Sequence, residues 1–93
     1  MTLIVSKMKV ENFEKWREAW NASRPVRAGS GMKSAQVLLI PDAPNSFAVV
    51  TYWESAGKAK EFVEKNKARI STQAAPGTTV EWLVYDEAFT ENY

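Results

Sequence analysis

The chain has 93 residues, with 12 Lys or Arg against 11 Asp or Glu, and its net charge is +1. This balance argues against a protein that binds nucleic acid by neutralising many phosphates. The chain contains no Cys and no His, which excludes disulfides, a thiol nucleophile, a thiolate metal site and an imidazole base. We therefore expect no metal and no other cofactor.

Aromatic side chains are numerous for so small a protein: 45% of the residues are hydrophobic, including four Trp, four Phe and three Tyr. One domain of this size, residues 1–93 with a tail at 86–93, buries only roughly 60–65% of its unfolded surface. The aromatic residues therefore fill an aromatic-rich core, line a pocket or meet a second chain. The apolar run within residues 1–7 is too short for a signal peptide or a membrane span, which predicts a cytoplasmic protein without membrane contact.

The first elements are a strand and a helix. Residues 2–10 alternate between two faces, which is typical of a strand. The pattern then changes, because Phe13, Trp16 and Trp20 recur at helical spacing. Asn12 precedes them and is a suitable N-cap. We therefore predict that the first helix begins near residue 12.

The first helix is interrupted and a hairpin follows it. Pro25 lacks a backbone N–H, so the helix kinks or restarts there. The glycines of residues 29–31 can take the positive φ that a helix end often needs. Residues 33–40 end in the apolar run Val-Leu-Leu-Ile, and residues 46–53 are rich in β-branched and aromatic side chains, so both segments predict strands. Residues 41–45, Pro-Asp-Ala-Pro-Asn, form the turn between them.

A second helix and a last strand complete the chain. Ser55 is the predicted cap of the second helix, which ends by residues 76–77, Pro-Gly. Residues 79–85 predict the last strand, and residues 86–93 an acidic tail. The apolar stripe of the second helix consists of Ala59, Phe62, Val63, Asn66 and Ile70.

The element order predicts the fold class. Strand, helix, strand, strand, helix and strand in one α+β domain give the ferredoxin-like βαββαβ arrangement, a four-stranded antiparallel sheet with the helices on one face. The other face should be polar, yet the strand at 46–53 is apolar on both faces. An exposed apolar face is unusual for a monomer, so we predict a homodimer joined through the sheets. Alternatively, the exposed apolar residues are scattered and need no partner.

Several segments carry a resemblance to a known family: residues 13–16, 24–29, 41–45, 49–55 and 59–62. In these segments the chain resembles the dimeric α+β barrel superfamily, which includes the antibiotic-biosynthesis monooxygenase-like proteins. The resemblance implies dimers formed across the sheets and pockets between sheet and helices. It also implies activities such as oxygenation of aromatic polyketides without a cofactor, haem degradation, lactone isomerisation or polyketide cyclisation.

The chain departs from this family at two points. It has no His for haem-degrading or His-based lactone chemistry. The first strand offers Ser6 where some of the oxygenases have Asn. The resemblance also places a substrate-facing tryptophan where Trp53 stands, and an indole there can stack on a flat substrate or plug the gap between strand and helix. Trp16 and Trp20 likewise either wall a cavity or belong to the helix core.

The remaining candidate site residues are polar. Tyr52, Tyr85 and Glu81 are predicted acid–base groups, provided that burial raises the pKa of the carboxyl group. Otherwise Glu81 is solvated or paired across a dimer. Ser6 and Gln36 are suited to orienting a carbonyl or hydroxyl group.

Basic residues gather around the end of the first helix. Arg24, Arg27 and Lys33 have no acidic residue among them. Guanidinium groups suit planar anions, so these residues either clamp a substrate anion at a pocket mouth or are solvated on the surface.

The predicted function is a small-molecule enzyme of the monooxygenase-like or polyketide-cyclase type, acting without metal on a largely apolar, aromatic substrate. The alternative is a non-catalytic ligand-binding or assembly protein of the same dimeric fold. RNA-binding domains share the strand order, but the first strand lacks the stacking aromatics and the third lacks the Gly-containing motif. No glycine-rich phosphate loop is present. We therefore expect a homodimer, a small-molecule ligand and no nucleic acid.

Overall fold

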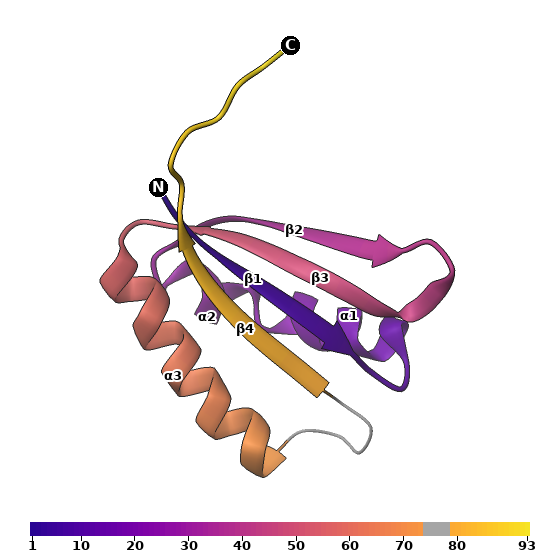
Figure 1. Ribbon diagram of the computed structural model, residues 1–93. Helices are drawn as coiled ribbons and strands as arrows, with labels where there is room; N and C mark the ends of the chain where they lie inside the picture. The colour runs from indigo at the N-terminus through magenta and orange to yellow at the C-terminus, as the bar shows by residue number, and fades with distance from the viewer. Residues whose placement is uncertain (74–78) are drawn as a thin grey trace.

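The computed structural model describes residues 1–73 and 79–93. Its strands form one antiparallel sheet in the order β2-β3-β1-β4, and the helices lie on one side of it (Figure 1). This is the ferredoxin-like fold that the element order predicts. The elements are β1 (Thr2–Lys9), α1 (Phe13–Ala22), α2 (Arg24–Ala28), β2 (Met32–Ile40), β3 (Ala43–Trp53), α3 (Ala56–Gln73) and β4 (Thr79–Asp86).

The strand register divides the sheet into two faces. Ile4 lies opposite Thr51 on one side and Val84 on the other, while Leu3 lies between Tyr52 and Tyr85 in the same way. Because strand side chains alternate, these two rows point to opposite faces. We call the first the helix face, since Ile4 packs against α3, and the second the open face. The alternation predicted for the first strand is confirmed.

Two apolar clusters fill the space between the helix face and the helices. The first lies beneath α3 and the second beneath α1, so each helix has its own aromatic packing partners. The α3 cluster comprises Ile4, Trp53, Ala59 and Val63 with Met32, Phe62 and Trp82 against them. The α1 cluster comprises Val10, Phe47 and Val49 with Met8, Phe13, Trp16, Trp20 and Val37 against them.

Two asparagines stabilise the start of α1. The side-chain oxygen of Asn12 accepts a hydrogen bond from the Lys15 backbone N–H at 3.0 Å, which confirms the predicted cap. The side-chain oxygen of Asn45 accepts from the Phe13 N–H, also at 3.0 Å. The first N–H groups of a helix have no intrahelical partner, so both bonds satisfy donors that would otherwise remain unpaired. Only the first of these caps was predictable from neighbouring residues.

The predicted break near Pro25 is confirmed, because α1 ends at Ala22 and α2 restarts at Arg24. The predicted start of the third strand at residue 46 is wrong. Ile40 pairs directly with Ala43, so β3 begins three residues earlier and the turn shortens to Pro41 and Asp42.

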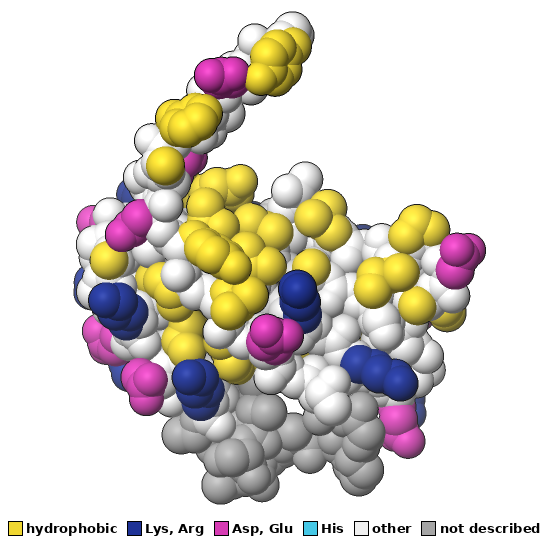
Figure 2. Space-filling model, viewed as in Figure 1, with side chains coloured by type: hydrophobic (Ala, Val, Ile, Leu, Met, Phe, Trp, Pro, Cys, Tyr) yellow, Lys and Arg dark blue, Asp and Glu magenta, His cyan; other side chains and the backbone are white. Residues whose placement is uncertain are grey.

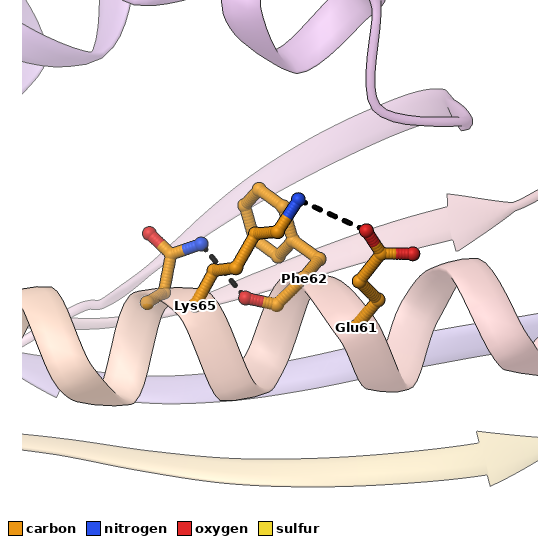
Figure 3. Close-up of polar contacts among 4 residues, drawn as sticks. Glu61, Phe62 and Lys65 are labelled. Atoms are coloured by element: carbon orange, nitrogen blue, oxygen red, sulfur yellow. Dashed lines mark hydrogen bonds and ion pairs between the residues drawn. The ribbon is translucent and has the colours of Figure 1, made fainter.

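The helix α3 begins as predicted, with the Ser55 hydroxyl accepting from the Lys58 N–H at 3.2 Å. Its exposed side carries an ion pair in which Lys65 Nζ is 2.9 Å from Glu61 Oε1 (Figure 3). This contact lowers the pKa of the Glu61 carboxyl group. Ile70 of the predicted stripe lies within α3, in the part of the helix whose side chains are not described, and the predicted stop at residues 76–77 lies outside the described residues. No helix in the described part of the chain is long and apolar enough to cross a membrane.

Candidate functional site

The sheet divides the predicted site residues between its two faces. Ser6 and Trp53 lie on the helix face, where Trp16 and Trp20 of α1 also pack. The other strand candidates alternate to the open face, so the predicted residues do not form one site within a single chain. These open-face candidates are Gln36, Tyr52, Glu81 and Tyr85.

Trp53 belongs to the packing beneath α3. Trp53 is only 2% exposed, and the centroid of its ring lies 4.8 Å from that of Phe62. The indole Nε1–H donates to the Thr51 hydroxyl at 2.7 Å, which satisfies a buried donor. The arrangement matches the alternative in which this tryptophan fills the gap between strand and helix. Thr51 is not among the predicted site residues, although its position two residues before Trp53 places both side chains on one strand face.

Ser6 lies between the two apolar clusters. It lies opposite Val49 of the α1 cluster and Trp82, which packs against the α3 cluster. The residue is only 5% exposed, and its hydroxyl has no hydrogen-bond partner among the described residues. No polar side-chain atom in the described part of the chain is both fully occluded and unpaired. The Ser6 oxygen is therefore not fully occluded, although the residue is buried.

The aromatic rings of α1 form a stack over the α1 cluster. The rings of Trp16 and Trp20 lie 5.3 Å apart at an interplanar angle of 23°, and Trp16 approaches Phe47 to 4.5 Å. Phe13 completes the stack, 5.7 Å from Trp16. All three α1 rings are half-buried, so they close the core under α1 while part of each ring stays exposed.

Arg27 of α2 is partly engaged by the end of α1 and by the residue between the two helices. Its guanidinium carbon lies 3.6 Å from the ring centroid of Trp20, its Nη2 donates to the Trp20 carbonyl and its Nε donates to the Ser23 hydroxyl at 3.2 Å. Burial, and then the charge of Arg24, lowers the pKa of Arg27. Arg24 and Lys33 are exposed. The predicted basic cluster is thus a surface feature with one anchored member.

The open face is apolar near one end of the sheet and polar near the other. Leu3 lies between the two tyrosines, whereas Lys7 lies opposite Glu81. Figure 2 shows apolar side chains gathered over the strands on the face turned to the viewer. The apolar residues of this face, which we call the open-face patch, are Leu3, Val5, Leu38, Ala48, Val50, Tyr52, Leu83 and Tyr85.

Tyr52 and Tyr85 are separated by one strand, because each is paired with Leu3 from a different side. Two strand spacings amount to about 10 Å, too far for a direct contact between the hydroxyl groups to follow from the backbone. Glu81 is exposed and lies four residues from Tyr85. Within the described residues, no group of three or more Asp or Glu side chains is arranged to hold a metal ion.

Several solved structures share the fold of this chain, although their sequence identity to it is low. The cofactor-independent oxygenase SnoaB from Streptomyces nogalater superposes with a TM-score of 0.75 at 14% identity, over 96% of this chain and 94% of that chain. The haem degrader MhuD from Mycobacterium tuberculosis, solved with two haems in its active site, gives 0.70 at 16% identity over 99% and 100%. A dimeric ferredoxin-like protein from an uncultured marine organism gives 0.56 at 8% identity over 100% of both chains.

No curated protein matches the chain. The family model described as Antibiotic biosynthesis monooxygenase matches residues 1–69, which include β1, all of β2 and β3, and most of α3. This match covers well over half of the chain and agrees with the resemblance carried by the sequence segments. The chain therefore belongs to the antibiotic biosynthesis monooxygenase family.

Proposed function

We propose that this protein is a monooxygenase-type enzyme that acts on a small, largely apolar aromatic substrate, and that its site lies over Ser6 on the helix face. The observation that carries the proposal is the buried hydroxyl of Ser6, unpaired among the described residues and set between two aromatic clusters. Ligand sites are characteristically apolar with a few convergent polar groups. Family membership supports the reaction type.

The chemistry at this site rests on positioning. A flat substrate stacks on the edge formed by Trp16 and Trp20, and its carbonyl oxygen accepts a hydrogen bond from the Ser6 hydroxyl. That bond stabilises the enolate left when the adjacent ring carbon gives its proton to solvent water. The carbanion then transfers electrons to O₂ and bonds to it, and the resulting peroxide anion takes a proton back from solvent. The hydroperoxide so formed loses water to give a ketone. One oxygen atom stays in the product and the other leaves as water.

Oxygen consumption with a hydroxy-anthrone probe tests this proposal. We expect the wild-type protein to consume one O₂ for each quinone formed, and to keep this rate after dialysis against a chelator. The variant Ser6→Ala should lose about tenfold or more, since a lost transition-state donor typically costs at least that much. Ser46→Ala is the matched control, because Ser46 shares a strand pair with Lys9 on the open face.

The outcomes separate the alternatives. Binding of the probe, followed by quenching of tryptophan fluorescence, without oxygen consumption would indicate the non-catalytic ligand-binding protein. Equal rates in Ser6→Ala and wild type would remove Ser6 from the site. A rate that disappears with the chelator and returns with added metal would contradict the metal-free part of the proposal.

The predicted acid–base roles of Tyr52, Tyr85 and Glu81 stay separate predictions. Because these residues lie on the open face, a site over Ser6 within one chain does not need them. The variants Tyr52→Phe, Tyr85→Phe and Glu81→Gln should then keep the wild-type rate. A large loss in any of them would locate chemistry on the open face instead.

We further propose that two chains pack with their open faces together. The support is the open-face patch, whose residues alternate out of the sheet on the side without helices. Sheets stacked face to face bury such side chains in an interface about 10 Å thick. The expected sedimentation mass at micromolar concentration is therefore twice the 10.5 kDa of one chain. The mass of a single chain would contradict this arrangement.

A further inference from the structure

The last residues form an arm anchored only at its root. The Thr2 hydroxyl donates to Asp86 Oδ1 at 2.5 Å, and the Glu87 N–H donates to the Met1 carbonyl at 2.9 Å. Beyond this point, residues 87–93 have no regular secondary structure. Figure 1 shows them leaving the end of β4 and extending away from the sheet and helices.

The arm carries large apolar side chains with no covering. Phe89 is 77% exposed and Tyr93 is fully exposed. The side-chain hydrogen bonds of the arm are local, from Thr90 to Glu87 at 3.0 Å and from the Tyr93 hydroxyl to Glu91 at 2.7 Å. Single exposed apolar residues are common, but two aromatic rings on a seven-residue projection form a pair of anchors typical of protein interfaces. The arm also carries two carboxylates.

A complementary surface lies at the same end of the sheet, on the opposite edge. The register places Met32 of β2, Trp53, Thr2 and Asp86 in one row across the sheet. The arm therefore begins at the β4 edge of this row, and β2 begins at the other edge. There Arg24 and Lys33 are exposed and in no ion pair among the described residues, and Val26 is exposed between them.

We propose that residues 87–93 dock onto α2 and the first residues of β2 of a second copy of the chain. The proposal rests on the face-to-face dimer proposed above. A two-fold axis parallel to the strands places the β4 edge of one sheet opposite the β2 edge of the other, at the same end. Seven extended residues reach about 23 Å, well beyond the roughly 10 Å between stacked sheets.

The contacts match in chemistry. Glu87 and Glu91 of the arm meet Arg24 and Lys33 of the second copy, while Phe89 and Tyr93 cover its exposed Val26. The arrangement also covers one end of β2, an edge strand whose free backbone groups would otherwise be open to pairing with other chains. The anion bound by the basic cluster is then a carboxylate of the partner, rather than a substrate.

The dissociation constant of the dimer tests whether the arm contributes to the contact between the two chains. In the full chain, the double variant Phe89→Ala/Tyr93→Ala should raise the dimer dissociation constant about tenfold or more, as removal of interface aromatics typically does. Leu39→Ala is the matched control, since Leu39 is an exposed apolar residue on the helix face and should leave the constant unchanged. If the wild-type protein is a dimer and the double variant has the same dissociation constant, the proposed docking of the arm is contradicted while the face-to-face dimer still stands.

Disulfide trapping tests the docking site. Because the chain has no native cysteine, any disulfide formed must join the introduced residues. A mixture of Glu91→Cys and Lys33→Cys chains should give a covalent heterodimer under a mild oxidant. A mixture of Glu91→Cys and Lys9→Cys chains should not, because Lys9 lies at the other end of the sheet. Trapping at Lys9 in preference, or no trapping between chains, would overturn the proposal. None of these readouts depends on oxygenase activity.

Discussion

Gly31 is the described residue whose backbone most restricts what can replace it. It has a φ of 100°, and a Cβ built there would lie 3.2 Å from Cβ and Cγ of Lys58. L side chains rarely adopt this φ, so Gly31→Ala should lower the free energy of unfolding by about 1–3 kcal/mol. Urea unfolding at one fixed protein concentration measures the change.

Gly29→Ala is the control for this prediction. Gly29 has a φ of −82°, and its built Cβ meets nothing closer than 3.6 Å. We therefore expect no loss of stability in this variant. Equal losses at the two glycines would show that backbone conformation is not the cause.

The same two glycines show what residue-level patterns can and cannot predict. The sequence marks residues 29–31 as the end of a helix, and that is where α2 ends. It does not say which glycine takes positive φ. At Gly31 an added Cβ would meet Lys58 of α3, and the Gly31 carbonyl accepts from the Glu54 N–H at 3.0 Å. Both partners are more than 20 residues away in the chain.

At the level of elements, the start of α1 depends on two side chains from different parts of the chain. Asn12→Ala and Asn45→Ala each remove one of the hydrogen bonds to the first turn. Loss of a helix cap typically costs about 1 kcal/mol, and we expect that loss from each variant. Far-UV circular dichroism during urea unfolding provides the measurement.

Asn21→Ala supplies the comparison for the caps, because Asn21 is exposed within α1 and caps nothing at its start. It should be neutral or slightly stabilising, since Ala is the better helix former. If Asn45→Ala behaves like Asn21→Ala, the bond from the hairpin to α1 does not contribute to stability.

Element boundaries were predictable where local chemistry sets them. Asn12, Pro25 and Ser55 each act through the next few residues, so the starts of α1, α2 and α3 follow from the sequence. The start of β3 does not, because Pro44 and Asn45 are typical turn residues. Pairing of Ala43 with Ile40 extends the ladder and overrides that preference.

For the whole molecule, the central prediction concerns association. Val5 lies on β1 between Val50 and Leu83 on the open face. Val5→Arg would place an unpaired charge within the proposed interface, which strongly disfavours burial. We expect this variant to sediment as one chain at micromolar concentration. Its melting temperature should also lose the concentration dependence expected of a dimer.

Leu39→Arg is the matched variant for Val5→Arg. Leu39 is exposed and points to the helix face, so the same charge there should leave a dimer. If both variants remain dimeric, or both dissociate, the open face is not the interface.

The sequence by itself determined the element order, the alternation of the first strand and two of the helix caps, because all of these depend on residues close together in the chain. It also placed the chain near its family through segments spread over most of its length. Its list of candidate site residues came from residue type, spacing and the family resemblance. None of these says which face of the sheet a site occupies, so the list combined residues that alternate to opposite faces.

Only the tertiary structure decided which face the helices cover, and hence that Ser6 and Trp53 share one side while Tyr52 and Tyr85 share the other. It also decided that the Thr51 hydroxyl is used by Trp53 while that of Ser6 has no partner among the described residues. Periodicity separates two faces of a strand without saying which one a helix covers. That choice depends on packing between residues far apart in the chain.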